Sequence, residues 1–69
     1  MIDTAKLKGK IVERGLTQQD VARLIGKTPK TFYLKMKKGV FDSNEISTMV
    51  EALEIENPAE IFFTNKVTS

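Results

Sequence analysis

Residues 18–38 read QQDVARLIGKTPKTFYLKMKK, and this stretch decides the fold. Thr17 stands just before it and can cap a helix, with an acidic residue three positions later as in a capping box. Gly26 ends that helix, because glycine adopts the positive φ of a sharp turn at little cost. Thr28 then caps a second helix, and Pro29 falls at its first position, where an N–H is not needed. The stretch therefore predicts two short helices joined by a tight turn.

Apolar residues recur in both helices at the spacing that gathers side chains on one helix face. We expect five of them to be buried: Val21, Leu24, Ile25, Phe32 and Met36. Ala22 is small, which lets the two helices approach closely where they cross. The pair is therefore expected to lock together through an apolar contact.

The same punctuation divides the rest of the chain into three further helices. Asp3, Asp42 and Asn57 each stand at a helix start, and Gly15 and Gly39 each follow a helix end. Apolar positions at helical spacing complete the expected core: Leu7, Ile11, Ile46, Met49, Val50, Leu53, Ile61 and either Phe62 or Phe63. The sequence thus predicts an all-α fold of five short helices over residues 1–63, followed by a polar tail, residues 64–69. One alternative stays open, in which residues 61–67 form an edge strand in a dimer.

Composition excludes several function classes. The 69 residues contain no Cys and no His, which rules out a disulfide, a zinc finger, a thiol nucleophile and an imidazole base. We expect no metal, no cofactor and no catalysis, and interpret five acids as caps or exposed helix positions: Glu45, Glu51, Glu54, Glu56 and Glu60. Residues 1–15 are too polar for a signal peptide, and no apolar run approaches the ~20 residues of a membrane span. A cytoplasmic protein is the expectation.

The net charge of +2 conceals a strong asymmetry along the chain. Residues 1–41 hold ten Lys and Arg against three acids, or +7, whereas residues 42–69 hold one Lys against six acids, or −5. Residues 23–38 alone carry six basic side chains and no acidic one. Charge separated in this way makes one end of a small body attractive to phosphate. A polyanionic partner is therefore expected.

The run LTQQDVARLIG, residues 16–26, resembles the opening of a Cro/repressor-type helix-turn-helix. The similarity continues through Thr28, Gly39 and the closing stretches 52–53 and 58–62, so that it covers roughly residues 5–63. It is greatest to the compact prophage Cro-like subgroup. The resemblance implies a small transcriptional regulator that binds duplex DNA sequence-specifically and acts by occupying an operator.

The resemblance also implies roles for individual residues, with the second helix of the motif in the major groove. Four residues are expected to contact bases: Thr28, Lys30, Thr31 and Tyr33. Five are expected on the DNA backbone: Gln18, Gln19, Lys35, Lys37 and Lys38. Lys30 is the leading candidate for base readout, because an ammonium can donate to O6 and N7 of guanine. The basic residues of the first helix, Lys6, Lys8, Lys10 and Arg14, are expected to be mostly solvated, with one or two reaching phosphate.

Two positions depart from the family pattern. Lys27 follows the turn glycine where an aliphatic residue is usual, and we expect its stem to cover the core while its amine reaches outward. Pro29 occupies a position at which family members often carry a base-reading polar residue. Readout is therefore expected to shift to the neighbours of Pro29.

Adjacent phenylalanines near the C-terminus indicate a surface for association. Phe62 and Phe63 cannot both point inward from one helix face, so one of them is expected to be exposed. We expect a homodimer on an inverted repeat, with its interface at Ile61, Phe62, Phe63 and Val67. The alternative is a protein-interaction module of the same fold, acting as an antirepressor or co-repressor through this surface.

Overall fold

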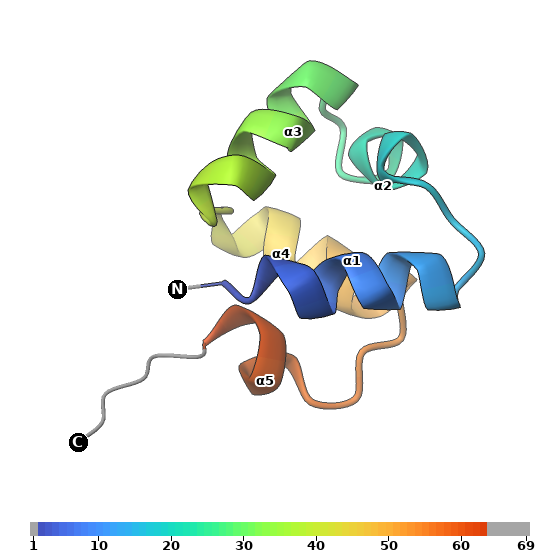
Figure 1. Ribbon diagram of the computed structural model, residues 1–69, viewed down its shortest axis with the longest axis vertical. Helices are drawn as coiled ribbons and strands as arrows, with labels where there is room; N and C mark the ends of the chain where they lie inside the picture. The colour runs from blue at the N-terminus through green and yellow to red at the C-terminus, as the bar shows by residue number, and fades with distance from the viewer. Residues whose placement is uncertain (1, 64–69) are drawn as a thin grey trace.

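The computed structural model describes residues 2–63, and these residues form helices and connecting turns without a strand (Figure 1). The helices are α1 (Thr4–Glu13), α2 (Gln18–Leu24), α3 (Pro29–Lys38), α4 (Ser43–Ala52) and α5 (Pro58–Phe62). The predicted all-α class with five short helices is confirmed. Ile61 and Phe62, at the start of the alternative edge strand, are helical, and the rest of that segment from residue 64 lies outside the described residues.

Side-chain caps define the starts of the first four helices. Each capping oxygen accepts a hydrogen bond from a backbone N–H in the first turn, at 2.8–3.2 Å, and the capping residues are Asp3, Thr17, Thr28 and Asp42. The side chain of Asn57 does not cap α5 in this way, although Pro58 does open that helix. Gly26, in the turn between α2 and α3, has a φ of +74°, as expected for the sharp turn. The local sequence signals therefore set the helix boundaries.

A single apolar core joins all five helices. Its most deeply buried large side chains come from the first four helices and the residue that follows α4: Leu7, Ile11, Val21, Phe32, Met49 and Leu53. Three core members were absent from the sequence expectation, namely Ile2, Phe41 and Ile55, which all lie outside the helices. Conversely, Leu24 was expected to be buried and is 50 % exposed, because it lies in the last turn of α2 on the side away from the core.

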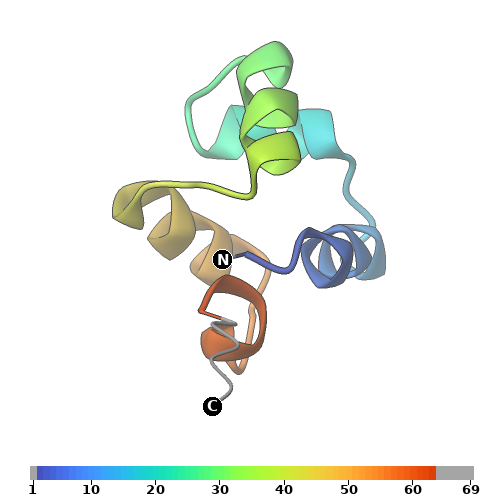
Figure 2. The same ribbon diagram turned by 60° about the vertical axis from the view of Figure 1, so that its left-hand side comes forward.

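The α2–α3 pair forms one end of the molecule, and α5 forms the opposite end, with α1 and α4 between them (Figures 1 and 2). The basic stretch 23–38 thus lies far from the acidic residues around α5. The backbone N–H of Asp3 donates to the carbonyl of Ile61 at 2.7 Å, which fixes the start of α1 beside α5. The basic stretch and the acidic residues around α5 therefore lie at opposite ends of the molecule, whereas Glu45, at the start of α4, lies beside α3.

Arg14 links α1 to the end of α4. Its Nε donates to the carbonyl oxygen of Leu53 at 2.8 Å, and a second guanidinium nitrogen donates to that of Glu54 at 3.3 Å. These carbonyls belong to the C-terminal end of α4, where a cation is stabilising. Arg14 remains exposed, as expected, but its guanidinium also has a structural role that the sequence did not reveal. Within residues 2–63 no helix has both the length and the apolar character needed to cross a bilayer.

Candidate nucleic-acid interface

One face of α3 is exposed, and five residues occupy it at positions i, i+3, i+4, i+7 and i+8: Lys30, Tyr33, Leu34, Lys37 and Lys38. This spacing places side chains on a single helix surface. The opposite face buries Phe32 and Met36 in the core. Because the core contacts of α3 lie on one side only, the lysine-rich side is left open to a partner.

The three lysines on this face differ from the other basic residues of the stretch 23–38. Within residues 2–63, Lys30, Lys37 and Lys38 have no acidic side chain within ion-pair distance. Arg23, by contrast, lies 3.5 Å from the carboxylate of Asp20. Three uncompensated ammonium groups on one helix face attract phosphate more strongly than paired ones.

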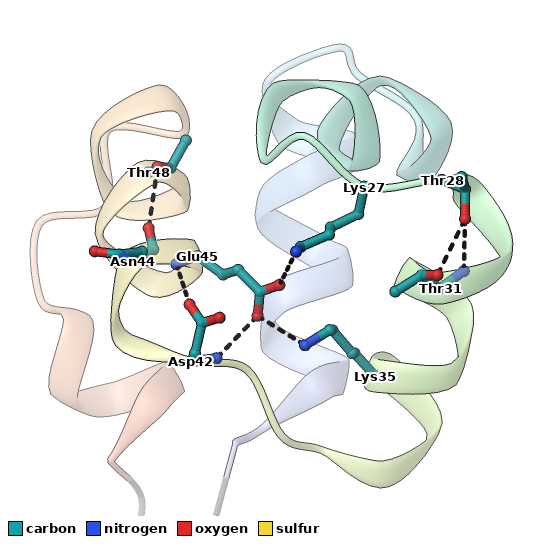
Figure 3. Close-up of polar contacts among 8 residues, drawn as sticks. All are labelled: Lys27, Thr28, Thr31, Lys35, Asp42, Asn44, Glu45 and Thr48. Atoms are coloured by element: carbon teal, nitrogen blue, oxygen red, sulfur yellow. Dashed lines mark hydrogen bonds and ion pairs between the residues drawn. The ribbon is translucent and has the colours of Figure 1, made fainter.

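The start of α3 carries two hydroxyl groups that bond to each other. The Thr28 hydroxyl oxygen accepts from the backbone N–H of Thr31 at 3.2 Å and donates to the Thr31 hydroxyl at 3.1 Å (Figure 3). In this arrangement the Thr31 hydroxyl keeps its own proton for an external acceptor. Thr28 is exposed and Thr31 half-buried, so both lie at the accessible end of the helix.

Tyr33 lies at the edge of the exposed face. Its ring packs edge-on against Phe32, with ring centroids 6.4 Å apart and an interplanar angle of 70°. Tyr33 also lines a polar depression of about 370 Å³ together with Lys8, Gln18 and Lys37. This depression brings Tyr33 together with Gln18 and Lys37, two of the residues predicted to contact the DNA backbone. It also includes Lys8 from α1. Sequence reasoning assigned Lys8 no individual role, since its proximity to α3 is a tertiary feature.

Gln18 and Gln19 open α2, as predicted, and are half-buried and exposed respectively. The α2 start is held by the capping box, in which the Asp20 carboxylate accepts from the backbone N–H of Thr17 at 2.9 Å. This bond, the hydroxyl of Thr17 and the nearby charge of Arg23 hold the pKa of Asp20 below its ordinary value. Asp20 is therefore a structural anion at neutral pH and orders the first turn of α2.

Glu45 is the buried centre of an ion cluster that the sequence did not reveal (Figure 3). Its side chain is only 3 % exposed. One oxygen, Oε1, accepts from Lys35 Nζ at 3.1 Å and from the backbone N–H of Asp42 at 2.9 Å. The other, Oε2, lies 3.9 Å from Lys27 Nζ and has no hydrogen bond within residues 2–63. Glu45 thus ties the α2–α3 turn and the middle of α3 to the start of α4.

This cluster changes the interpretation of two lysines. Lys27 was expected to send its amine outward, but its ammonium is directed at Glu45, because a buried carboxylate requires a counter-charge. Lys35 was expected on the DNA backbone, but its ammonium is bonded to Glu45 within the protein. We therefore assign Lys35 to the ion cluster, apart from the three unpaired lysines on the exposed face of α3. Lys35 and Glu45 are ten residues apart in the sequence, so no local pattern predicts their contact.

The predicted dimer residues divide in three ways. Ile61 and Phe62 are buried in the core, so the described surface does not offer their side chains to a partner. Phe63 is 60 % exposed, and it borders an apolar hollow lined by Phe41, Ile46 and Val50. Val67 lies outside the described residues. The exposed member of the phenylalanine pair is therefore Phe63.

Within residues 2–63 no three acidic side chains gather in the way that metal ligands do. Comparisons of the chain with protein-family models, with curated proteins and with solved structures found no match. The assignment of a function therefore depends on the geometry and charge of the α2–α3 end.

Proposed function

We propose that this protein binds duplex DNA sequence-specifically, as a small Cro-like transcriptional regulator of the phage type that acts by occupying an operator. One observation carries the proposal: the exposed face of α3 presents three lysines, at one end of the molecule, that pair with no acid in residues 2–63. The resemblance of residues 16–26 to Cro/repressor-type helix-turn-helix proteins supports the same conclusion. A protein seated on an operator blocks transcription without a chemical step.

In the proposed complex, α3 enters the major groove and α2 crosses the DNA backbone, the docking geometry of helix-turn-helix proteins. Lys30, in the first turn of α3, faces base edges and donates to O6 and N7 of guanine. Thr28 and Thr31 contact a base or the first phosphate. Lys37 and Lys38, in the last turn, bind phosphates and supply affinity that falls with salt.

A second copy of the chain completes the proposed site, because one such unit contacts too few base pairs to specify a single site in a genome. Two-fold symmetry then requires half-sites about one DNA turn (~34 Å) apart. Phe63 and the hollow formed by Phe41, Ile46 and Val50 offer an apolar surface on the described part of the chain. This surface replaces the pair Ile61 and Phe62 in the expected interface.

Selection from a randomised duplex pool tests the proposal. We expect the wild type to enrich an inverted repeat, and Lys30→Ala to lose preference at one base pair of each half-site. Lys38→Ala is the matched control, because the exposed ammonium is removed from the same helix face. It should weaken binding to all sequences alike while keeping the enriched repeat. No binding at low salt would contradict DNA binding altogether.

The apolar surface around Phe63 also favours a second candidate, a protein-interaction module that acts as antirepressor or co-repressor. Substitution of the exposed lysines distinguishes the two candidate functions. Substitution of Lys30 and Lys37 abolishes activity if the protein works on DNA and spares it if the protein works through Phe63.

A further inference from the structure

Leu34 is an exposed leucine in the middle of the basic face of α3. Its side chain is 51 % exposed and takes no part in the apolar core. Helical spacing surrounds it with Lys30 and Thr31 on one side and with Lys37 and Lys38 on the other. No polar group of a nucleic acid gains from contact with leucine, so this position has a different task from its neighbours.

The surrounding lysines fix the class of partner that Leu34 meets. Three ammonium groups that pair with no acid in the described part of the chain attract a polyanion, and the face is therefore proposed to lie against DNA. The apolar group that base edges present in the major groove is the C5-methyl of thymine. An aliphatic side chain gains free energy when that methyl group is removed from water.

Building on the proposed DNA binding, we propose that Leu34 is a specificity-determining residue that contacts the C5-methyl group of thymine. Lys30 and Leu34 are four residues apart, about 6 Å along the helix axis. Successive base pairs are about 3.4 Å apart. Each half-site therefore contains a thymine within about two base pairs of the guanine bound by Lys30.

Tyr33 does not duplicate this role. Its ring packs edge-on against Phe32 and lines the depression with Lys8 and Gln18, on the α1–α2 side of the exposed face. Leu34 is the next residue, about 100° further round the helix, on the side of Thr31 and Lys38. The two exposed apolar surfaces of α3 therefore face different parts of the DNA.

Replacement of thymine by deoxyuridine tests the contact, since deoxyuridine lacks only the methyl group. The probe is the tightest duplex that the wild type selects, compared with the same duplex carrying deoxyuridine at every half-site thymine. We expect wild-type Kd to rise about fourfold for each methyl group that Leu34 covers. For Leu34→Ala the two duplexes should bind with Kd values within about twofold of each other.

Val12→Ala is the control, because Val12 is an exposed aliphatic residue on α1, 73 % accessible and outside the α3 face. This variant should respond to deoxyuridine as the wild type does. Leu34→Ala replaces one strong helix former by another at an exposed site, so the fold is expected to persist, as circular dichroism will show.

Different outcomes overturn different claims. An equal effect of deoxyuridine on wild type and Leu34→Ala, or a selected half-site without thymine, contradicts the role of Leu34 while leaving DNA binding intact. A wild type that binds no duplex at low salt contradicts both.

Discussion

Glu45 shows how one residue can serve two parts of the structure. Its Oε1 completes the capping box of α4 by accepting from the backbone N–H of Asp42, and the same oxygen accepts from Lys35. Its burial would be unfavourable for an isolated carboxylate, and the two lysines supply the counter-charge. The cap was predictable from the Asp42–Glu45 spacing, whereas the lysine contacts depend on how α3 and α4 pack.

Glu45→Gln is expected to destabilise the protein by about 1–3 kcal/mol, because it removes a charge bonded to Lys35 and leaves two ammonium groups without their counter-charge. Partial exposure of both lysines keeps the effect below that of a fully buried pair. Glu51→Gln, an exposed carboxylate on the same helix, should change stability by less than about 0.5 kcal/mol. Urea unfolding measures both, and equal effects of the two substitutions would show that the cluster adds nothing.

Asp20 gives a prediction about pH. The Thr17 backbone N–H and hydroxyl, with Arg23, hold its pKa below the ordinary value in the folded state. A depressed folded-state pKa means that the contribution to stability is present above the unfolded-state value of about 3.9. That contribution is lost as the pH falls through the lower, folded-state pKa. Carboxyl NMR titration should place Asp20 below a model aspartate, and Thr17→Ala should raise its pKa toward that value. An unshifted Asp20 would argue against the capping box.

At the scale of the elements, the α2–turn–α3 unit depends on backbone conformation as much as on side chains. Gly26 has a φ of +74°, a region that residues with a Cβ adopt at a cost. A Cβ at Gly26 would meet no atom of the described residues within 4 Å, so any effect of substitution there is one of backbone strain. Gly9 also has open space around it, but it lies inside α1 and does not have a positive φ.

Gly26→Ala should therefore destabilise the protein by about 1–2 kcal/mol through the positive φ. Gly9→Ala should stabilise it by about 0.5–1 kcal/mol, because alanine loses less backbone entropy in a helix. Thermal unfolding of the two variants beside the wild type gives both signs in one experiment. Stabilisation by Gly26→Ala would mean that the turn has another conformation in solution.

Much of the helical architecture was predictable because it is encoded locally. Caps, stops and apolar spacing lie within a few residues of one another, and they placed all five helices correctly. Predictions failed where the outcome depends on distant segments. Leu24 has the right spacing for the core but lies at the end of α2 on its exposed side. The hydrogen bonds of Arg14 were not predicted, because their acceptors lie 39 and 40 residues away in the sequence.

In the candidate site, too, the predictions that local periodicity supports agree with the structure, and those that depend on distant residues do not. Positions on the exposed face of α3, such as Lys30 and Lys37, follow from helical periodicity, and the structure finds them exposed. Lys35 has an equally basic side chain, but a carboxylate ten residues away determines its direction. Leu34 was not expected at the interface, although the same periodicity that selected Lys30 places it there.

At the scale of the whole molecule, the surface that we propose for self-association is the apolar one beside α4. Phe63 borders the hollow lined by Ile46 and Val50, and serines line the rest of its α4 wall. Phe63→Ser should therefore weaken self-association about tenfold or more, as measured by sedimentation equilibrium. Val12→Ser removes a comparably exposed apolar residue from α1 and should leave it unchanged. If both variants associate like the wild type, or if the wild type stays monomeric on operator DNA, this surface is not a dimer interface.

The most direct test of the central claim is the salt dependence of duplex binding, measured by fluorescence anisotropy for three proteins. We expect the slope of log K against log salt to become shallower by about 1.8 in Lys37→Ala/Lys38→Ala, or about 0.9 for each phosphate that the variant no longer binds. The charge-matched control is Lys6→Ala/Lys10→Ala, whose side chains lie about half a turn round α1 from Lys8, and it should keep the wild-type slope. Equal slopes in all three proteins, or no salt-sensitive binding by the wild type, would contradict the assignment of the α3 face to DNA.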